Sequence, residues 1–361
     1  MDVYTRASGT DRKKTMTDLR TGKILVVRND RLGDFMLAYP ALAALKESLP
    51  EATVCTLVPN YTRPMAEVCD WVDRVITDVP ATSKHPLAET VKLLRAERFD
   101  AVISLFSTTR IAVAAFLARI PVRVAPRTKL AQVFNTDRVA QRRSRSEKPE
   151  YEYNVDLIWN FLDRYRLPRT GALPQPPFLS LARSEELRQA FCVKHGISAN
   201  DSLVFLHAGS GGSARNLSLE QYADLVANLA FGDRSYTVVL SAGPGEVERA
   251  EALSTMLRHR RIPHVVYRSD AGLLSFAEHI QFADMFISGS TGPLHIAGAL
   301  DVPTAAFYPR RKSATSLRWQ TLNSPGRRLA FSPPKHAAEE DMGCIDVREA
   351  ADAISRKFLR D

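Results

Sequence analysis

The stretch KILVVRNDRLGD, residues 23–34, carries the signal from which the fold class follows most directly. Residues 23–28 form a short, β-branched apolar run, which predicts a buried strand of a parallel sheet. A polar turn follows, where Gly33 lets the chain bend sharply, and apolar residues then recur at helical spacing over residues 35–49 until Pro50. A strand, a glycine-containing turn and a helix in this order are typical of the first unit of an open α/β fold.

Strand and helix signals alternate along the rest of the chain in the same way. Further strands are expected at residues 53–58, 72–76, 101–105, 203–207, 236–240, 264–267, 285–288 and 303–308. Further helices are expected at residues 88–97, 154–165, 185–195, 219–229, 247–257, 293–300 and 346–358. This alternation predicts right-handed parallel sheets that are covered by helices on both faces.

The length of 361 residues indicates two domains of roughly 150 to 180 residues each. Residues 167–177, LPRTGALPQPP, hold four prolines and a glycine, which is typical of a stiff, extended connector. We therefore expect a polar tail (1–22), a Rossmann-like domain (23–166), a linker (167–177) and a second Rossmann-like domain with a closing helix (178–361). Ligands of such domains bind at the carboxyl ends of the strands, so we expect a cleft between the two sheets.

Composition narrows the class of protein. Apolar residues make up 45% and charged residues 25%, as in a globular protein, and the four cysteines lack CxxC spacing. A disulfide framework or zinc site is therefore not expected, which fits a reducing compartment. The polar N-terminus lacks the apolar core of a secretory signal, and no stretch approaches the ~18 to 20 apolar residues of a membrane span. We expect a cytoplasmic protein that is at most peripheral to a membrane.

Much of the net charge of +9 lies within residues 119–148. The cations of this segment are Arg119, Arg123, Arg127, Lys129, Arg138, Arg142, Arg143, Arg145 and Lys148, against the acids Asp137 and Glu147. Such a segment favours polyanions, namely nucleic acid, anionic lipid headgroups or phosphorylated glycans. A solvated loop that keeps the protein soluble is an equally open interpretation.

The first candidate site is the turn from Arg28 to Asp34. A carboxylate at the end of a strand is a plausible general base, and helix N-terminal amides stabilise its charged form. The alternative is an ordinary N-cap for the following helix. Leu37 stands where a capping box would have Glu or Gln.

The second candidate site is the loop HAGSGGSAR, residues 207–215, at the start of the second domain. Ser210, Gly211, Gly212 and Ser213 expose backbone N–H groups suited to anionic oxygen, and Arg215 adds a cation. The loop matches neither a Walker A motif nor GxGxxG, and it could also be merely flexible.

The third candidate site is SGSTGPLH, residues 288–295. Pro293 is expected as the first helical residue, and Ser290, Thr291 and Gly292 would cradle a pyrophosphate at the positive helix end. A plain N-cap is the alternative, and His295 is either a packing histidine or a catalyst. A weaker site is Gly243–Glu246 (GPGE), where Glu246 either accepts from ribose hydroxyls or begins the next helix.

In this order, the three loops resemble those of glycosyltransferase family 9, the ADP-heptose:lipopolysaccharide heptosyltransferases. The resemblance covers most of residues 23–309. It rests on ILVVRNDRLGDFMLAYPALAALKESLPEATVCTLV (24–58), HAGSGGSARNLSLEQYADL (207–225) and ISGSTGPLHIAGALDVPTAAFYP (287–309). Ala208 replaces the proline that is usual in the family, and Ser290 stands where many members have Asp.

The resemblance implies a GT-B fold and an inverting transfer in which Asp34 is the catalytic base and Arg215 acts on the donor phosphates. Donor contacts are implied for residues 210–213, for Ser290, Thr291, Gly292, Pro293 and His295, and, at the nucleoside, for Gly243 and Glu246. Acceptor contacts are expected from Arg28, Arg31, Gly33, Arg142 and Arg143. No D-x-D occurs in the chain, so neither a metal nor a cofactor is expected beside the co-substrate ADP-heptose.

The leading hypothesis is therefore transfer of a heptose to the anionic lipopolysaccharide core, next to the inner membrane. Other hypotheses are a GT-B enzyme for another sugar or acceptor, a nucleotide-sugar 2-epimerase, and a non-catalytic module that binds polyanions. A dehydrogenase is disfavoured by the lack of GxGxxG. A nucleic-acid partner is not expected, since no RNA- or DNA-binding motif is recognisable.

Overall fold

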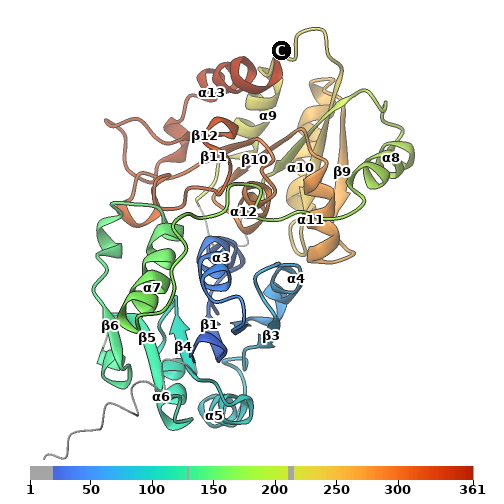
Figure 1. Ribbon diagram of the computed structural model, residues 1–361. Coiled ribbons are helices and arrows are strands. Elements are labelled where there is room, and N and C mark those ends of the chain that lie inside the picture. The colour runs from blue at the N-terminus through green and yellow to red at the C-terminus, as the bar shows by residue number, and fades with distance from the viewer. Residues whose placement is uncertain (1–18, 128–129, 210–214, 361) are drawn as a thin grey trace, which may run out of the picture. The chain divides into compact units, whose positions relative to one another are not determined.

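The computed structural model describes residues 19–127, 130–209 and 215–360, and the chain forms two compact units (Figure 1). The first unit takes in the described residues up to Arg142 together with Tyr151–Pro174. The second takes in Arg143–Glu150 and the described residues from Gln175 onward. The short segment Arg143–Glu150 therefore groups with the second unit, although the boundaries drawn from the sequence place it in the first domain.

The first unit is built on a six-stranded parallel sheet with the strand order β3-β2-β1-β4-β5-β6. Its strands are β1 (Lys23–Val27), β2 (Thr53–Val58), β3 (Arg74–Thr77), β4 (Ala101–Ser104), β5 (Val122–Pro126) and β6 (Asp137–Val139). β1 is central, pairing with β2 through Lys23↔Thr53 and with β4 through Ile24↔Ala101. The strand order reverses at β1, which is where open α/β sheets bind their ligands. The turn after β1 therefore lies where a ligand is expected to bind.

Helices flank this sheet. They are α2 (Leu32–Met36), α3 (Tyr39–Ser48), α4 (Arg63–Glu67), α5 (Pro86–Glu97), α6 (Thr109–Leu117) and α7 (Glu150–Arg164), with short helical turns at η1 (Asn60–Thr62) and η2 (Leu130–Phe134). The single helix that the sequence predicts over residues 35–49 is wrong, because α2 ends at Met36 and α3 begins at Tyr39. Pro40 explains the break, since a proline lacks the N–H that a helix interior needs but is tolerated in the first turn.

The second unit has its own six-stranded parallel sheet, with the order β12-β11-β10-β7-β8-β9. Its strands are β7 (Ser202–His207), β8 (Tyr236–Ala242), β9 (His264–Arg268), β10 (Met285–Gly289), β11 (Thr304–Phe307) and β12 (Arg328–Phe331). Its helices are α8 (Ser184–His195), α9 (Leu219–Ala227), α10 (Val247–His259), α11 (Leu273–Gln281), α12 (Gly292–Ala299) and α13 (Val347–Ile354). Short helical turns lie at η3 (Arg143–Arg145), η4 (Lys312–Ala314), η5 (Pro325–Arg327) and η6 (Met342–Cys344).

The predicted α/β class with parallel sheets is confirmed in both units. β2 has the predicted bounds, and β7 and β10 are each one residue longer than predicted. The closing helix expected over residues 346–358 is α13 followed by a π-helical turn, η7 (Ser355–Leu359). Sequence patterns missed β5, β6 and β12. Of these, β6 and β12 are short edge strands of three and four residues and are not fully buried.

Candidate active site

Asp34 lies within the first turn of α2, at the carboxyl end of the central strand β1. The alternative interpretation as an N-cap is wrong, because the cap residue is Arg31 and its side chain makes no capping hydrogen bond. The Asp34 carboxylate instead accepts from Arg28, with 2.5 Å between Oδ1 and Nη2. Its side chain is 13% exposed, so the carboxylate reaches solvent at the carboxyl end of the sheet.

The buried side chain of Arg28 links the residues of this turn by hydrogen bonds. Its side chain is 2% exposed, and three of its nitrogens each serve a different partner. Nε donates to Asp30 Oδ1 at 2.9 Å, Nη2 donates to Asp34, and Nη1 donates to Asn154 Oδ1 at 3.1 Å. The Asn154 amide in turn donates to the carbonyl of Leu37, which caps the C-terminal end of α2. Arg28, predicted to contact the acceptor, is thus buried beneath the carboxylates, whereas Arg31 is exposed and Gly33 is half-buried.

Asp30 is a member of this site that sequence reasoning missed. Its side chain is 14% exposed, and burial raises the pKa of its carboxyl to about 7. The nearby Asp34 charge raises this pKa further, while Arg28 lowers it. The sequence signal that could have identified Asp30 is an acidic residue two positions after Arg28 in the same turn.

In the second unit, Glu246 and His207 meet at the ends of β8 and β7. Glu246 Oε2 accepts from the backbone N–H of Gly243 at 3.0 Å and lies 3.5 Å from His207 Nε2. Burial lowers the pKa of His207, although the Glu246 charge opposes this shift. A Cβ at Gly209 would lie 2.1 Å from Glu246 Oε1, so only glycine leaves room for the carboxylate. The predicted nucleoside contacts Gly243 and Glu246 are therefore brought together.

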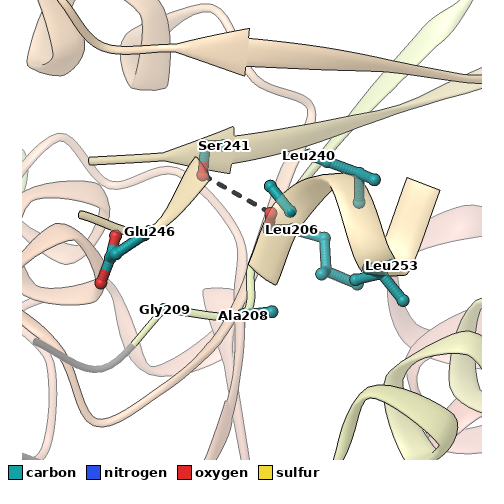
Figure 2. A pocket seen from close by; sticks show the side chains of 8 residues that line it. Leu206, Ala208, Gly209, Leu240, Ser241, Glu246 and Leu253 are labelled. Atoms are coloured by element: carbon teal, nitrogen blue, oxygen red, sulfur yellow. Dashed lines mark hydrogen bonds between the residues drawn. The ribbon is translucent and has the colours of Figure 1, made fainter. Parts of the chain in front are cut away.

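A small pocket adjoins this carboxylate (Figure 2). Leucine side chains gather on one side of it and Glu246 lies on the other. Its lining residues are Leu206, Ala208, Gly209, Leu240, Ser241, Glu246, Ala250 and Leu253. The space is smaller than the pockets that take small-molecule ligands, so it shows only that an apolar wall lies beside the carboxylate.

The loop between β7 and α9 is fastened at both ends. Ser210, Gly211, Gly212 and Ser213, the predicted phosphate contacts, lie outside the described residues. Asn216 Nδ2 donates to the carbonyls of Ala208 and Gly209 at 3.0 and 3.1 Å. Arg249 donates to the carbonyls of Ala208 and Leu217 at 2.8 and 3.1 Å. Arg215 next to this clamp is 69% exposed, and its Nε lies 3.5 Å from Glu340 Oε2.

The turn after β10 leads directly into α12. Thr291 is the N-cap residue and its side chain makes no capping bond; its hydroxyl lies 3.0 Å from that of Ser288. Gly292 is the first helical residue and Pro293 the second, so the prediction of Pro293 at the first position is off by one. Ser290 is partly exposed at this positive helix end. His295 lies behind it, and burial lowers the pKa of its imidazole to about 4.

The predicted acceptor residues Arg142 and Arg143 have different environments. Arg142 is exposed, whereas Arg143 is 14% exposed and its Nη1 donates to Glu150 Oε1 at 2.7 Å. Glu150, itself 1% exposed, also pairs with Arg318 at 2.5 Å. Charge reversal at Arg143 would therefore test this buried ion pair rather than acceptor binding.

Across residues 19–127, 130–209 and 215–360, none of the helices has the length and apolar character needed to cross a bilayer. In that same part of the chain, no three His, Cys, Asp or Glu side chains gather in a way that could hold a metal ion.

Known proteins resemble this chain in sequence and in fold. The family description "Glycosyltransferase family 9 (heptosyltransferase)" matches residues 88–323, more than half of the chain. A Haemophilus influenzae protein, provisionally named a glycosyltransferase, is 44% identical over 94% of this chain and 97% of its own length. Lipopolysaccharide heptosyltransferase 2 of Salmonella typhimurium is 25% identical over 79% of this chain and 82% of its own.

Solved structures agree on the fold. The glycosyltransferase family 9 structure from Veillonella parvula superposes with a TM-score of 0.78 at 17% identity, covering 95% of this chain and 99% of that one. The Escherichia coli ADP-heptose lipopolysaccharide heptosyltransferase II superposes with a TM-score of 0.73 at 19% identity, covering 94% and 99%. The chain therefore belongs to glycosyltransferase family 9 and has the two-domain α/β fold, GT-B, of these relatives.

Proposed function

We propose that this protein is an inverting, metal-independent glycosyltransferase in which Asp34 is the general base. The carboxylate takes the proton of an acceptor hydroxyl, whose oxygen attacks the anomeric carbon of a nucleotide sugar while the nucleoside diphosphate leaves. The observation that supports this role is the position of Asp34, partly exposed at the carboxyl end of the central strand and oriented by the buried Arg28. A base must be held within hydrogen-bond reach of the proton it removes, and a fixed guanidinium provides such an orientation.

The second unit offers groups that suit the donor. The N-terminus of α12 presents backbone N–H groups that Thr291 leaves uncapped, and a positive helix end stabilises a leaving diphosphate. Arg215 adds an exposed cation beside the clamped loop. The Glu246 carboxylate over Gly209 is suited to accept hydrogen bonds from ribose hydroxyls. No cofactor is part of this proposal beyond the donor itself.

We further propose that the donor is ADP-heptose and the acceptor the lipopolysaccharide core. The names of the relatives support this, since the Salmonella enzyme is a lipopolysaccharide heptosyltransferase and the Escherichia coli structure an ADP-heptose enzyme. The exposed Arg119, Arg127, Arg138 and Arg142 supply positive charge for an anionic, phosphorylated glycan. We place the reaction in the cytoplasm at the surface of the inner membrane, where such an acceptor would be reached.

The variant Asp34→Asn tests the function. Asn keeps the shape and can still accept from Arg28, so we expect the fold to persist while kcat falls by roughly 10² to 10⁴. Turnover is measured with ADP-, UDP- and GDP-linked sugars, and the ADP-linked heptose should be used best. Asp163→Asn is the control, because this carboxylate is 62% exposed on α7 and should leave kcat unchanged.

Two outcomes would contradict the proposal. Near-normal turnover of Asp34→Asn would assign the base to another residue. Conversion of the nucleotide sugar without any acceptor would favour a 2-epimerase over a transferase.

A further inference from the structure

Two carboxylates share one buried guanidinium at the proposed base. Asp30 and Asp34 both accept from Arg28, at 2.9 Å from Nε and 2.5 Å from Nη2. Arg28 is 2% exposed, and the carboxylates are 14% and 13% exposed. One positive charge therefore faces two negative ones in a place where water screens them poorly.

The other groups around Asp30 do not supply a second cation. From η1, the hydroxyl of Tyr61 donates to the Asp30 backbone carbonyl at 2.9 Å, and burial raises the pKa of this phenol. From α7, Asn154 is uncharged. The neighbouring Asn29 donates to Asp78, whose charge is already paired with Arg110 at 2.6 Å. Among the described residues, Arg28 is thus the cation in hydrogen-bond contact with the Asp30 carboxyl.

This arrangement makes ionisation of both carboxyls costly. When both are charged, the cluster of Arg28, Asp30 and Asp34 has a net charge of −1 in a mostly buried site, which desolvation disfavours. The burial that raises the pKa of Asp30 to about 7 places its protonation change close to neutral pH. Asp30 therefore changes charge within the range in which a cellular enzyme works.

We propose that Asp30 is a positioning residue that regulates the basicity of Asp34 through the guanidinium they share. This inference rests on the proposed role of Asp34 as the base. With Asp30 protonated, the charge of Arg28 is directed to Asp34 alone, which weakens Asp34 as a base. With Asp30 ionised, Arg28 is divided between the two, and the added negative charge increases the proton affinity of Asp34.

The protons of the two carboxyls have separate fates. The Asp30 proton passes to solvent as the pH rises and takes no part in the transfer itself. The acceptor proton moves to Asp34 as the glycosidic bond forms, and Asp34 releases it after the product leaves. No further reactant is needed.

The test is the pH profile of kcat for Asp30→Asn in the full-length protein. We expect wild-type kcat to rise through an apparent pKa near 7, as Asp30 ionises. Asp30→Asn cannot ionise, so its profile should be flat through this range, with kcat roughly three- to tenfold lower at pH 8, because Arg28 then serves the Asp34 carboxylate alone. KM for the nucleotide sugar should change less than about twofold, because donor contacts are not altered. Asp30→Glu, which restores the charge, should recover the rise.

Thermal stability gives a readout that does not depend on turnover. The folded-state pKa of Asp30 lies above its usual value of 3.8, so the native protein retains this proton between about pH 4 and 7. Stability from Asp30 is therefore present at low pH and lost as the pH rises through 7. The difference in Tm, Asp30→Asn minus wild type, should become more positive between pH 5 and pH 8.

The outcomes separate the two proposals. An Asp30→Asn profile with the same pH dependence as wild type would overturn this inference, even if Asp34→Asn is inactive. An active Asp34→Asn would instead remove the proposed base. Asp163→Asn again serves as the control and should reproduce the wild-type profile.

Discussion

At the scale of single residues, the candidate site depends on the shape of one side chain. Arg28 directs Nε, Nη1 and Nη2 to three different residues, two of them carboxylates. A guanidinium presents its donors in a rigid, planar fork, whereas lysine has a single nitrogen on a flexible stem. The motif Arg28–Asp34 could be found from the sequence, but this division of its bonds could not, because Asn154 is 126 positions away.

The variant Arg28→Lys separates the effect of side-chain geometry on kcat from the effect of positive charge. We expect kcat to fall by about 10², because the ammonium keeps a positive charge but cannot orient Asp34 while also bonding Asp30 and Asn154. The measurement is steady-state turnover, with circular dichroism to confirm the fold. Arg63→Lys is the matched control, since Arg63 is 48% exposed and pairs with Glu67 within α4. Unchanged kcat in Arg28→Lys would mean that charge alone suffices.

At the scale of elements, loops are positioned by side chains from neighbouring segments. The clamp on the β7–α9 loop depends on Asn216, which also accepts from the hydroxyl of Tyr222 on α9. The Asn216 side chain packs closely against Gly289 at the end of β10. A Cβ at Gly289 would lie 2.5 Å from Asn216 Oδ1. The sequence indicates a glycine-rich loop at residues 207–215, and its role in donor binding stays a prediction.

Gly289→Ala should therefore displace this clamp. We expect KM for the nucleotide sugar to rise by roughly tenfold, because the ends of the loop move, and the free energy of unfolding to fall by about 1 to 3 kcal/mol from overpacking. Steady-state kinetics and urea unfolding measure the two effects. Gly326→Ala is the control, because a Cβ at that position meets no atom within 4 Å. Equal KM values for the two variants would argue against a role of the clamp.

At the scale of the whole molecule, the chain passes between the two units three times, after Arg142, Glu150 and Pro174. The segment between the first two passages is fixed within the second unit by the buried Glu150, which pairs with Arg143 and Arg318. Arg318 Nη1 also donates to the carbonyl of Arg143 at 2.7 Å. Part of the basic segment 119–148 thus stabilises the fold, while Arg142 remains exposed.

Removal of the Glu150 charge tests this anchor. Glu150→Gln leaves two largely buried guanidiniums facing a neutral amide, so the free energy of unfolding should fall by roughly 3 to 5 kcal/mol. Urea denaturation measures the change. Glu147→Gln, at a carboxylate that is 59% exposed, should change stability by less than about 0.5 kcal/mol. A loss equal to that of the control would show that the Glu150 cluster contributes little.

The sequence by itself determined the alternation of strands and helices and the places of the turns, because these depend on apolar periodicity and on glycine and proline among neighbouring residues. The tertiary structure alone decided that Asp30 and Asp34 share Arg28, that Asn154 joins them, and that Glu150 pairs with Arg318. Asn154 and Arg318 lie far from their partners in the sequence, whereas Asp30 and Asp34 are near Arg28 in the chain but depend on burial for the strength of their pairing. Distant contacts and burial both arise only when separate segments meet, so local patterns do not record them.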